Sequence, residues 1–377
     1  MNSIVISGDF VGTNRVQAFA DEKKFDELLG ETKALFQDFD YRMVNLESPV
    51  ASSTACAITK CGPSLKCNEQ AVGLLKFAGF DGVTLANNHF YDYGEEGVQT
   101  TIQSLSQHQI DHVGGGRNLE EASATLYKKI NGDTVAFINC TEHEFSIATQ
   151  HSGGSNPLNP ISQYHAIREA RAKADYVIVI THGGIEGYDK PTPRMQETYR
   201  FFIEVGADAV VNHHQHCPSG YEVYLGKPIF YGLGNFCFDI PSYEQRPWNK
   251  GYAVVLLLDD GQVSFRLLPY VQCQGRPGVR FLQGAEKDDF LKEIEQLNAV
   301  IAQPSRIAEA HEAFMDATSA PHGFLFLPFG SRIAESLFDR RLLPLCYAKN
   351  KWPLMLNKIE CESHRERLIH FIKKKLR

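Results

Sequence analysis

The sequence predicts an α/β fold, and three features of the chain support this prediction. Short apolar segments rich in β-branched residues alternate with segments of helical periodicity over roughly the first 240 residues. Polar residues that can bind metal ions stand at the ends of several apolar segments. The length of 377 residues, with 43% hydrophobic and 22% charged residues, allows one large domain with a smaller extension.

The apolar segments are expected to form β-strands because β-branched and aromatic side chains are enriched in them. They are Ile4–Ser7, Tyr41–Leu46, Val83–Ala86, Thr134–Cys140, Tyr176–Thr181, Ala209–Asn212 and Pro228–Gly232. Strands separated by helices need crossover connections, which favour a largely parallel sheet covered on both faces.

The helical segments have recognisable starts and stops. Asn68 can cap a helix that Gly79 ends. Glu95 and Glu96 open another helix, where the helix dipole favours acidic side chains. Two more helices are predicted over Ser162–Ala174 and Thr192–Val205.

The pattern changes after Gly251. The apolar segments 252–258 and 262–271 flank Asp259-Asp260-Gly261, which is a hairpin signal. This hairpin would add antiparallel strands to the edge of the sheet or form a second sheet.

The last part of the chain is predicted to be helical or irregular. Glu286–Ala302 has a helical pattern, and Ser319–Gly330, rich in Pro, Gly and Phe, is expected to be a packed loop. We therefore expect a main domain over residues 1–275 and an extension over residues 276–377 that packs on it.

The terminal segment Lys351–Arg377 is basic, with eight Lys or Arg against three Glu and a local net charge of +5. A basic terminal helix is usually a solvated face or a docking element. Peripheral contact with an anionic polymer or a membrane surface is the alternative.

The composition excludes several classes of protein. A net charge of −7 gives no support to nucleic-acid binding, which needs a basic surface. No apolar run reaches 18 residues, and the segment at residues 1–10 lacks signal-peptide features, so neither a transmembrane helix nor a leader is expected. Nine cysteines, an odd number without C-x₂-C pairs, indicate reduced thiols in a cytoplasmic protein.

Polar residues cluster at the ends of five predicted strands. In an open parallel sheet the carboxyl ends of the strands lie along one edge, where ligands bind. We therefore expect two carboxylates, an amide and several imidazoles to meet there: Asp9, Glu47, Asn88, His89, His182, His214 and His216.

These residue types suit divalent transition metals, which bind carboxylate oxygen, neutral imidazole and amide oxygen. A carboxylate such as Glu47 could bridge two ions about 3.5–4 Å apart, as in two-metal hydrolases. Taken singly, each motif has a structural explanation: Gly8-Asp9 is a common turn, Glu47 could cap a backbone, and Asn88 could belong to a polar turn. Three histidines within residues 213–216 are rarely needed for packing.

Six motifs in the same order resemble the CapA-like (poly-γ-glutamate capsule biosynthesis) family, a branch of the calcineurin-like metallophosphoesterases. They span roughly residues 3–240: GDF (8–10), NLESPV (45–50), LANNHFYDYGEEG (85–97), HGGIEGY (182–188), GADAVVNHHQH (206–216) and GKPIFYGLGNFCFD (226–239).

The resemblance implies an αββα sandwich with metal ligands on loops at strand ends. It implies metal ligation by Asp9, Glu47, Asn88, His182, His214 and His216, with Glu47 bridging. His89 is implied to protonate the leaving oxygen, and Asp92 and Glu186 to support the ligands or face the substrate.

Three departures from the family pattern affect the site. Val11 stands where the superfamily has a ligating His, so we expect one tight divalent ion and a second, weaker one, with Mn, Zn or Fe as candidates. Phe90 replaces the acid that follows the His of the Asn-His motif, and Asp92 could take over its role. Gly183 stands where related sequences commonly have Trp, which predicts a more open pocket.

The sequence therefore predicts a metal-dependent hydrolase, with a phosphoesterase favoured, in capsule or poly-γ-glutamate metabolism. A metal-bound hydroxide would attack, and His89 would act as general acid. The expected substrate is a small molecule or polymer that is phosphorylated or polyanionic. The alternatives are hydrolysis of a γ-glutamyl or peptide amide, and a non-catalytic polymer-assembly role in which the basic C-terminus contacts the partner.

Overall fold

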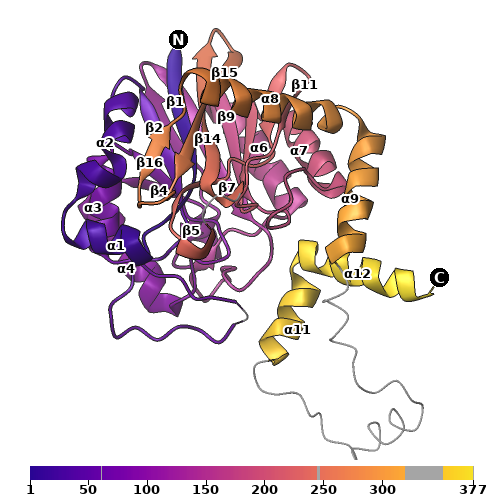
Figure 1. The fold of residues 1–377 in the computed structure, drawn as a ribbon, viewed down its shortest axis with the longest axis horizontal. Helices are drawn as coiled ribbons and strands as arrows, with labels where there is room; N and C mark the ends of the chain where they lie inside the picture. The colour runs from indigo at the N-terminus through magenta and orange to yellow at the C-terminus, as the bar shows by residue number, and fades with distance from the viewer. Residues whose placement is uncertain (61, 244–246, 319–350, 377) are drawn as a thin grey trace, which may run out of the picture.

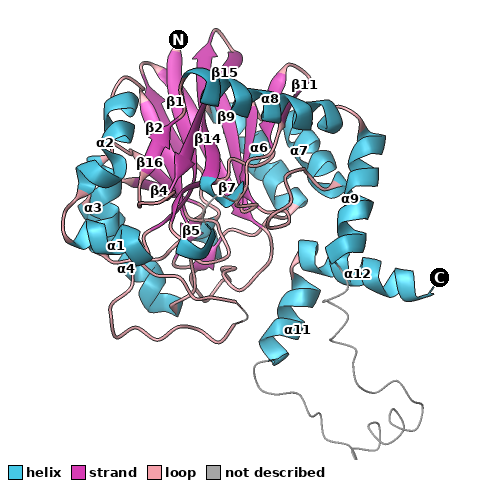
Figure 2. Ribbon diagram, in the orientation of Figure 1, coloured by secondary structure: helices cyan, strands magenta, loops and turns pink. Residues whose placement is uncertain are grey.

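Two β-sheets pack face to face between layers of helices in the computed structural model, which describes residues 1–60, 62–243, 247–318 and 351–376. Figure 2 shows the strands gathered in the middle of the molecule and helices on its outside. The predicted α/β class and the αββα sandwich are confirmed.

The first sheet has the order β16-β15-β14-β1-β2-β3-β4, with β13 paired to the far end of β1. Strands β1, β2, β3 and β4 are parallel, and β14, β15 and β16 continue the sheet in antiparallel fashion. The strands are β1 (Asn2–Val11), β2 (Tyr41–Leu46), β3 (Gly82–Thr84), β4 (Asp111–Val113), β13 (Asn235–Phe238), β14 (Lys250–Asp259), β15 (Gln262–Gln272) and β16 (Val279–Phe281).

The second sheet has the order β11-β12-β10-β9-β7-β6. Its centre, formed by β7, β9, β10 and β12, is parallel, while β6 and β11 are antiparallel edge strands. The strands are β6 (Leu126–Ile130), β7 (Asp133–Thr141), β9 (Tyr176–His182), β10 (Ala209–His213), β11 (Tyr221–Tyr224) and β12 (Lys227–Phe230). A small pair, β5 (Gly115–Gly116) and β8 (Gly154–Ser155), lies apart from both sheets.

Three buried clusters correspond to the layers of the sandwich. Alternating side chains of β1 show the arrangement: Ile4 and Ile6 enter the cluster between the sheets, whereas Val5 packs with the helices outside. The period of two that defines a strand therefore gives each sheet one face towards the other sheet and one towards helices.

Helices α1 to α4 cover the first sheet, and α6 and α7 cover the second. The predicted cap of α3 is confirmed, because the side chain of Asn68 accepts a hydrogen bond from the backbone of Gln70. The helices of this part are α1 (Asn14–Asp21), α2 (Phe25–Phe36), α3 (Glu69–Phe77), α4 (Gly94–Gln107), α5 (Leu119–Ala122), α6 (Pro160–Lys173) and α7 (Pro193–Val205).

The alternation of strands and helices predicted a largely parallel sheet covered on both faces, and in this detail the prediction is wrong, because the strands form two sheets that cover each other on one face. The strands predicted to carry the metal ligands divide between two sheets, with β1 to β3 in one and β9 and β10 in the other. An alternation of strands and helices leaves open which strands pair, so one sheet and two sheets produce the same sequence pattern. The hairpin after Gly251 extends the edge of the first sheet, because β14 pairs with β1.

The rest of the described chain is helical: α8 (Gly284–Ile301), α9 (Pro304–Thr318), α11 (Lys351–Glu360) and α12 (Glu362–Leu376). Phe290 and Ile294 of α8 join the cluster between the sheets. The single basic terminal helix expected over 351–377 is instead two helices that meet at Cys361. The predicted loop Ser319–Gly330 lies outside the described residues, and the domain boundary near residue 275 stays a prediction. No helix in the described ranges has the length and apolar character needed to span a membrane.

A bulge in β1 determines where Asp9 points. The register with β2 shifts between Ser7 and Asp9, and the register with β13 shifts between Asp9 and Phe10. Asp9 therefore lies within a strand at a bulge, and the prediction that it follows the strand is wrong. Bulges redirect side chains in this way near functional sites. A Cβ atom at Gly8 would lie 1.9 Å from the carbonyl oxygen of Gly234, so only glycine fits beside the bulge.

Replacing Gly8 with Ala should destabilise the protein by about 1–3 kcal/mol or more, because the clash is with backbone that a side-chain rotation cannot relieve. Urea or thermal unfolding of the full chain measures this. The control is Gly73→Ala in α3, where the new Cβ would lie 3.7 Å from Phe25, an ordinary contact. Since Ala favours helices, the control should be neutral or slightly stabilising. Equal stability of the two variants would contradict the assigned role of Gly8.

Candidate metal centre

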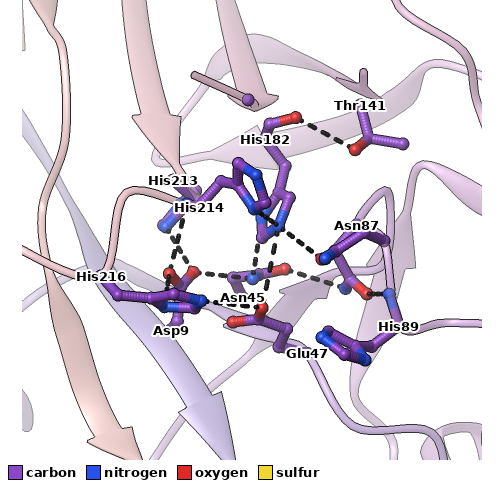
Figure 3. A network of polar contacts seen from close by, with 12 residues as sticks. Asp9, Asn45, Glu47, Asn87, His89, Thr141, His182, His213, His214 and His216 are labelled. Atoms are coloured by element: carbon purple, nitrogen blue, oxygen red, sulfur yellow. Dashed lines mark hydrogen bonds and ion pairs between the residues drawn. The ribbon is translucent and has the colours of Figure 1, made fainter. Parts of the chain in front are cut away.

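Four side chains converge from both sheets on one point, and Figure 3 shows the histidines above Glu47. His182 Nε2 lies 3.0 Å from Asn88 Oδ1, 3.1 Å from His214 Nδ1 and 3.8 Å from Glu47 Oε1. Metal–ligand bonds of about 2.0–2.2 Å place neighbouring ligand atoms about 3–4 Å apart, so these separations suit one ion. Glu47, His182 and His214 each offer a potential ligand atom, and these three atoms lie within 4.8 Å of one another.

A second group of potential ligands shares Glu47 with the first. Asp9, Glu47 and His216 each offer an atom close enough to the others to hold an ion. His216 Nε2 lies 3.6 Å from Glu47 Oε1, while its Nδ1 lies 2.8 Å from Asn235 Oδ1. A hydrogen bond from one imidazole nitrogen fixes the ring so that the other nitrogen can bind a metal.

The Glu47 carboxylate shows that the residues present fit a cation. Glu47 is completely buried, and neither of its oxygens has a hydrogen-bond partner among the described residues. Burial and the charge of Asp9 raise the pKa of Glu47 well above its usual value. A buried carboxylate without donors is costly unless a positive charge compensates it, and an ion held between the two groups would do so.

Asp9 is held by groups on both sides. The side-chain nitrogen of Asn45 donates to Asp9 Oδ1 at 2.7 Å, and the backbone N–H of His214 donates to Oδ2 at 3.3 Å. His213 Nδ1 lies 3.2 Å from Oδ1. Burial raises the pKa of Asp9, but the contacts with His213 and His216 outweigh it and keep the pKa well below its usual value. Asp9 is therefore an anion available to a metal.

The backbone after β10 is strained where it presents two histidines. His214 and His216 have φ angles of 92° and 56°, which side-chain-bearing residues rarely adopt. Such conformations persist when surrounding structure enforces them, and they concentrate at functional sites. The turn directs both imidazoles back towards Glu47 (Figure 3).

His89 lies beside the ligands, in contact with two charged residues. Its Nδ1 is 2.7 Å from Asp92 Oδ2 and 3.1 Å from the ammonium of Lys60, which also forms an ion pair with Asp92. Burial lowers the pKa of His89, the hydrogen bond with Asp92 opposes this, and the charge of Lys60 adds to the lowering. Asp92 thus contacts the His89 ring and can orient it, as predicted for a chain that has Phe90 in place of the acid of the superfamily.

Glu186 is exposed, yet its carboxylate lies close enough to His214 and His216 to complete a third possible metal-binding group. The prediction that Gly183 opens the pocket is wrong. A Cβ atom at Gly183 would lie 2.7 Å from Glu142 Cγ, so the buried Glu142 side chain occupies this space.

The contacts thus bring together seven of the nine predicted site residues: Asp9, Glu47, Asn88, His182, Glu186, His214 and His216. His89 and Asp92 contact each other, and Figure 3 shows His89 beside Glu47. Sequence reasoning missed Lys60, Asn45 and Glu142. Asn45 lies two residues before Glu47, in the register that faces the same side of β2, and this was a usable signal. Lys60 lies in a loop without motif, and no pattern identifies it.

Comparison with known sequences gives consistent matches. Residues 3–240 match the family model described as "Bacterial capsule synthesis protein PGA_cap". Capsule biosynthesis protein CapA of Bacillus anthracis is 32% identical over 73% of this chain and 68% of its own length. PGA biosynthesis protein CapA of Bacillus subtilis is 33% identical over 62% of this chain and 64% of its own length. The chain thus spans about two thirds of these relatives.

Solved structures with a similar arrangement include a novel phosphatase from Mycoplasma pneumoniae, with a TM-score of 0.46, 16% identity, and coverage of 72% of this chain and 93% of that one. The 5'-nucleotidase precursor from Thermus thermophilus has a TM-score of 0.42 and 12% identity, and the match covers 80% and 60% of the two chains.

Proposed function

Because this chain belongs to the family of bacterial capsule synthesis proteins described as PGA_cap, and because a shared buried carboxylate joins two groups of potential metal ligands, we propose that it is a metal-dependent hydrolase of capsule-type polymer metabolism. A phosphoester is the favoured substrate. The observation that carries the proposal is Glu47, which is buried without a hydrogen-bond partner among the described residues and lies between the two groups.

The residues divide the work in the proposed reaction. Asn88, His182 and His214 with Glu47 would hold one ion, and Asp9 and His216 with Glu47 would hold the other. Divalent ions such as Mn, Zn or Fe, when bound, would lower the pKa of a water molecule and neutralise negative charge on a substrate oxygen. His89 delivers a proton to the leaving oxygen, and Asp92 positions its ring and stabilises its protonated form.

A second candidate function is cleavage of a γ-glutamyl amide, favoured by the relative named as a PGA biosynthesis protein. The same centre could serve either bond, since a carbonyl and a phosphorus are both open to attack by water. A non-catalytic assembly role has less support, because such a role would not need the His89–Asp92 pair beside the ligands. The cytoplasmic location and a peripheral contact through the basic terminus stay predictions.

The test is a substrate screen with the full chain loaded with manganese or zinc. Phosphomonoesters, phosphodiesters and γ-glutamyl peptides are offered in parallel, with the Glu47→Gln variant as the inactive reference. Hydrolysis of a phosphoester that the variant does not catalyse supports the proposal. Cleavage of γ-glutamyl peptides alone replaces it by the amide hydrolase, and no turnover in any class favours the assembly role.

We expect one tightly bound ion and one weak ion. The first group has four protein ligands, whereas the second has three, because Val11 cannot bind a metal. Metal content after extensive dialysis should therefore be near one equivalent, rising towards two with added manganese or zinc, and mass spectrometry of the metal measures it. Two equivalents that survive dialysis would contradict this. Glu186 and His213 are then the residues to replace, since both lie beside the second group.

A further inference from the structure

Helix α12 is docked beside the metal centre through two ion pairs. Glu362 accepts hydrogen bonds from the ring and the backbone N–H of His143, at 2.8 Å and 3.0 Å, just beyond the end of β7. One turn later, Glu366 accepts from Arg194 Nε at 2.5 Å. The first turns of α12 therefore contact the chain just after β7 and the start of α7. Figure 1 shows α12 below α9.

The neighbouring face of α12 is turned towards the metal centre. His364 and Arg367 are three residues apart on α12 and share this face, and Cys361 directly precedes the helix. Cys361 is fully buried, and His364 Nδ1 lies 3.7 Å from Glu144 Oε1. Burial raises the pKa of Glu144, and a hydrogen bond with Asn88 opposes it. Glu144 therefore connects α12 with the metal centre, because its side chain contacts both the potential ligand Asn88 and His364 of α12.

Arg367 is the unusual residue on this face. Its Nε is buried and has no hydrogen-bond partner among the described residues, and no carboxylate described in the structure forms an ion pair with it. Its guanidinium lies 5.7 Å from the centre of the Phe314 ring. The Phe314 ring in turn packs against Tyr188, with ring centres 4.4 Å apart, so Arg367 lies near the loop that carries Glu186. Burial lowers the pKa of Arg367, while the charge of Glu186 opposes this.

A docking role does not account for Arg367. The residues that anchor α12, Glu362 and Glu366, are partly buried, and both are paired with a basic side chain. A partly buried guanidinium with donors left over is instead suited to a carboxylate or phosphate, which it can bind through two parallel hydrogen bonds. Several carboxylates line the centre, so a guanidinium beside it would favour the binding of an anionic substrate.

We propose that Arg367 binds an oxyanion of the substrate, a carboxylate or a phosphate, at the mouth of the metal centre, so that α12 forms part of the substrate site. The inference rests on the proposed function in one respect: the bound molecule is a substrate only if the protein is a hydrolase. The C-terminal extension would then take part in substrate recognition by binding a negatively charged group of the substrate.

The test is calorimetric titration of the metal-loaded full chain with two probes, inorganic phosphate and γ-glutamylglutamate. Arg367→Ala should raise the dissociation constant of at least one probe by about 10–100-fold, since a charge-assisted hydrogen bond is lost. The probe that is affected identifies the oxyanion as phosphate or carboxylate. Arg367→Lys should recover part of the affinity, because a point charge remains without the bidentate geometry.

The matched control is Arg365→Ala, which removes an exposed arginine from the same helix. It should leave both dissociation constants within about twofold. Unchanged binding of both probes in Arg367→Ala, or equal losses in the two variants, would overturn the inference. Loss of binding in Arg367→Ala without turnover of any substrate by the parent protein would refute the proposed hydrolase and leave the oxyanion site standing. Where a substrate is found, KM should rise and kcat should change little.

Discussion

Replacing His89 with Ala should lower turnover by about 10²–10⁴-fold without changing metal content, because general acid catalysis typically contributes this much. The His89 ring is positioned by Asp92, whose Oδ2 lies 2.7 Å from His89 Nδ1. His89 is not a member of the two groups of potential metal ligands that share Glu47. The measurement is steady-state hydrolysis of a phosphoester with a poor leaving group, together with metal analysis of the same sample.

The leaving group makes this experiment selective. A nitrophenolate departs without a proton, so the variant should lose much less activity on such a substrate than on an alkyl ester. His151→Ala, which removes an exposed histidine whose side chain forms no hydrogen bond or ion pair with a predicted site residue in the described part of the chain, is the control and should be fully active. If the His89 variant hydrolyses the alkyl ester at the parent rate, His89 has no part in proton transfer.

Glu47→Gln should abolish detectable activity and reduce the affinity for both ions. Outer residues that support a ligand typically contribute 10–100-fold to metal affinity, so loss of a shared ligand should cost more than about 100-fold. The metal-free protein should nevertheless keep its stability within about 1 kcal/mol, because the Glu47 oxygens have no hydrogen-bond partner among the described residues to lose. Metal titration and urea unfolding of the metal-free variant measure the two effects.

Asp239 provides the matched control, since it is also fully buried but is paired. Both of its oxygens accept hydrogen bonds from the Arg15 guanidinium, at 2.7 Å and 2.9 Å. Asp239→Asn should therefore destabilise the protein by about 1–3 kcal/mol and leave metal binding intact. Glu47→Gln should thus lose metal affinity and keep its stability, whereas Asp239→Asn should lose stability and keep its metal affinity. A large loss of stability in metal-free Glu47→Gln, with its metals retained, would assign Glu47 a purely structural role.

The parts of this molecule that could be predicted from sequence are those encoded locally. Asn68 and Thr192 cap helices through their own side chains, and strand ends are visible as a change from apolar to polar residues. The convergence of Glu47, Asn88, His182 and His214 followed because each stands at such a strand end. Their ligand roles came from the family resemblance and await the experiments above.

The parts that could not be predicted depend on contacts between distant segments. The division of strands between two sheets is decided by side-chain packing across the core, where Ile4 of one sheet and Ile180 of the other belong to one buried cluster, and no local pattern records it. The position of Asp9 depends on a bulge beside Gly8, where the absence of a side chain allows the carbonyl group of Gly234, distant in sequence, to approach. Lys60 contacts His89 from a loop, and α12 docks through Glu362 and Glu366; no local pattern in the sequence records either contact.

The division of the ligands between two sheets has a mechanical consequence. Asp9, Glu47 and Asn88 come from the layer of β1, β2 and β3, whereas His182, His214 and His216 come from the layer of β9 and β10. An ion held by residues of both layers would join the two sheets, and separating the layers would then require breaking its bonds to the protein. By mass action, an ion present at 100 times its dissociation constant adds about 2.7 kcal/mol to the free energy of unfolding. The supply of metal in the cell would then regulate how long the folded protein persists as well as how fast it works.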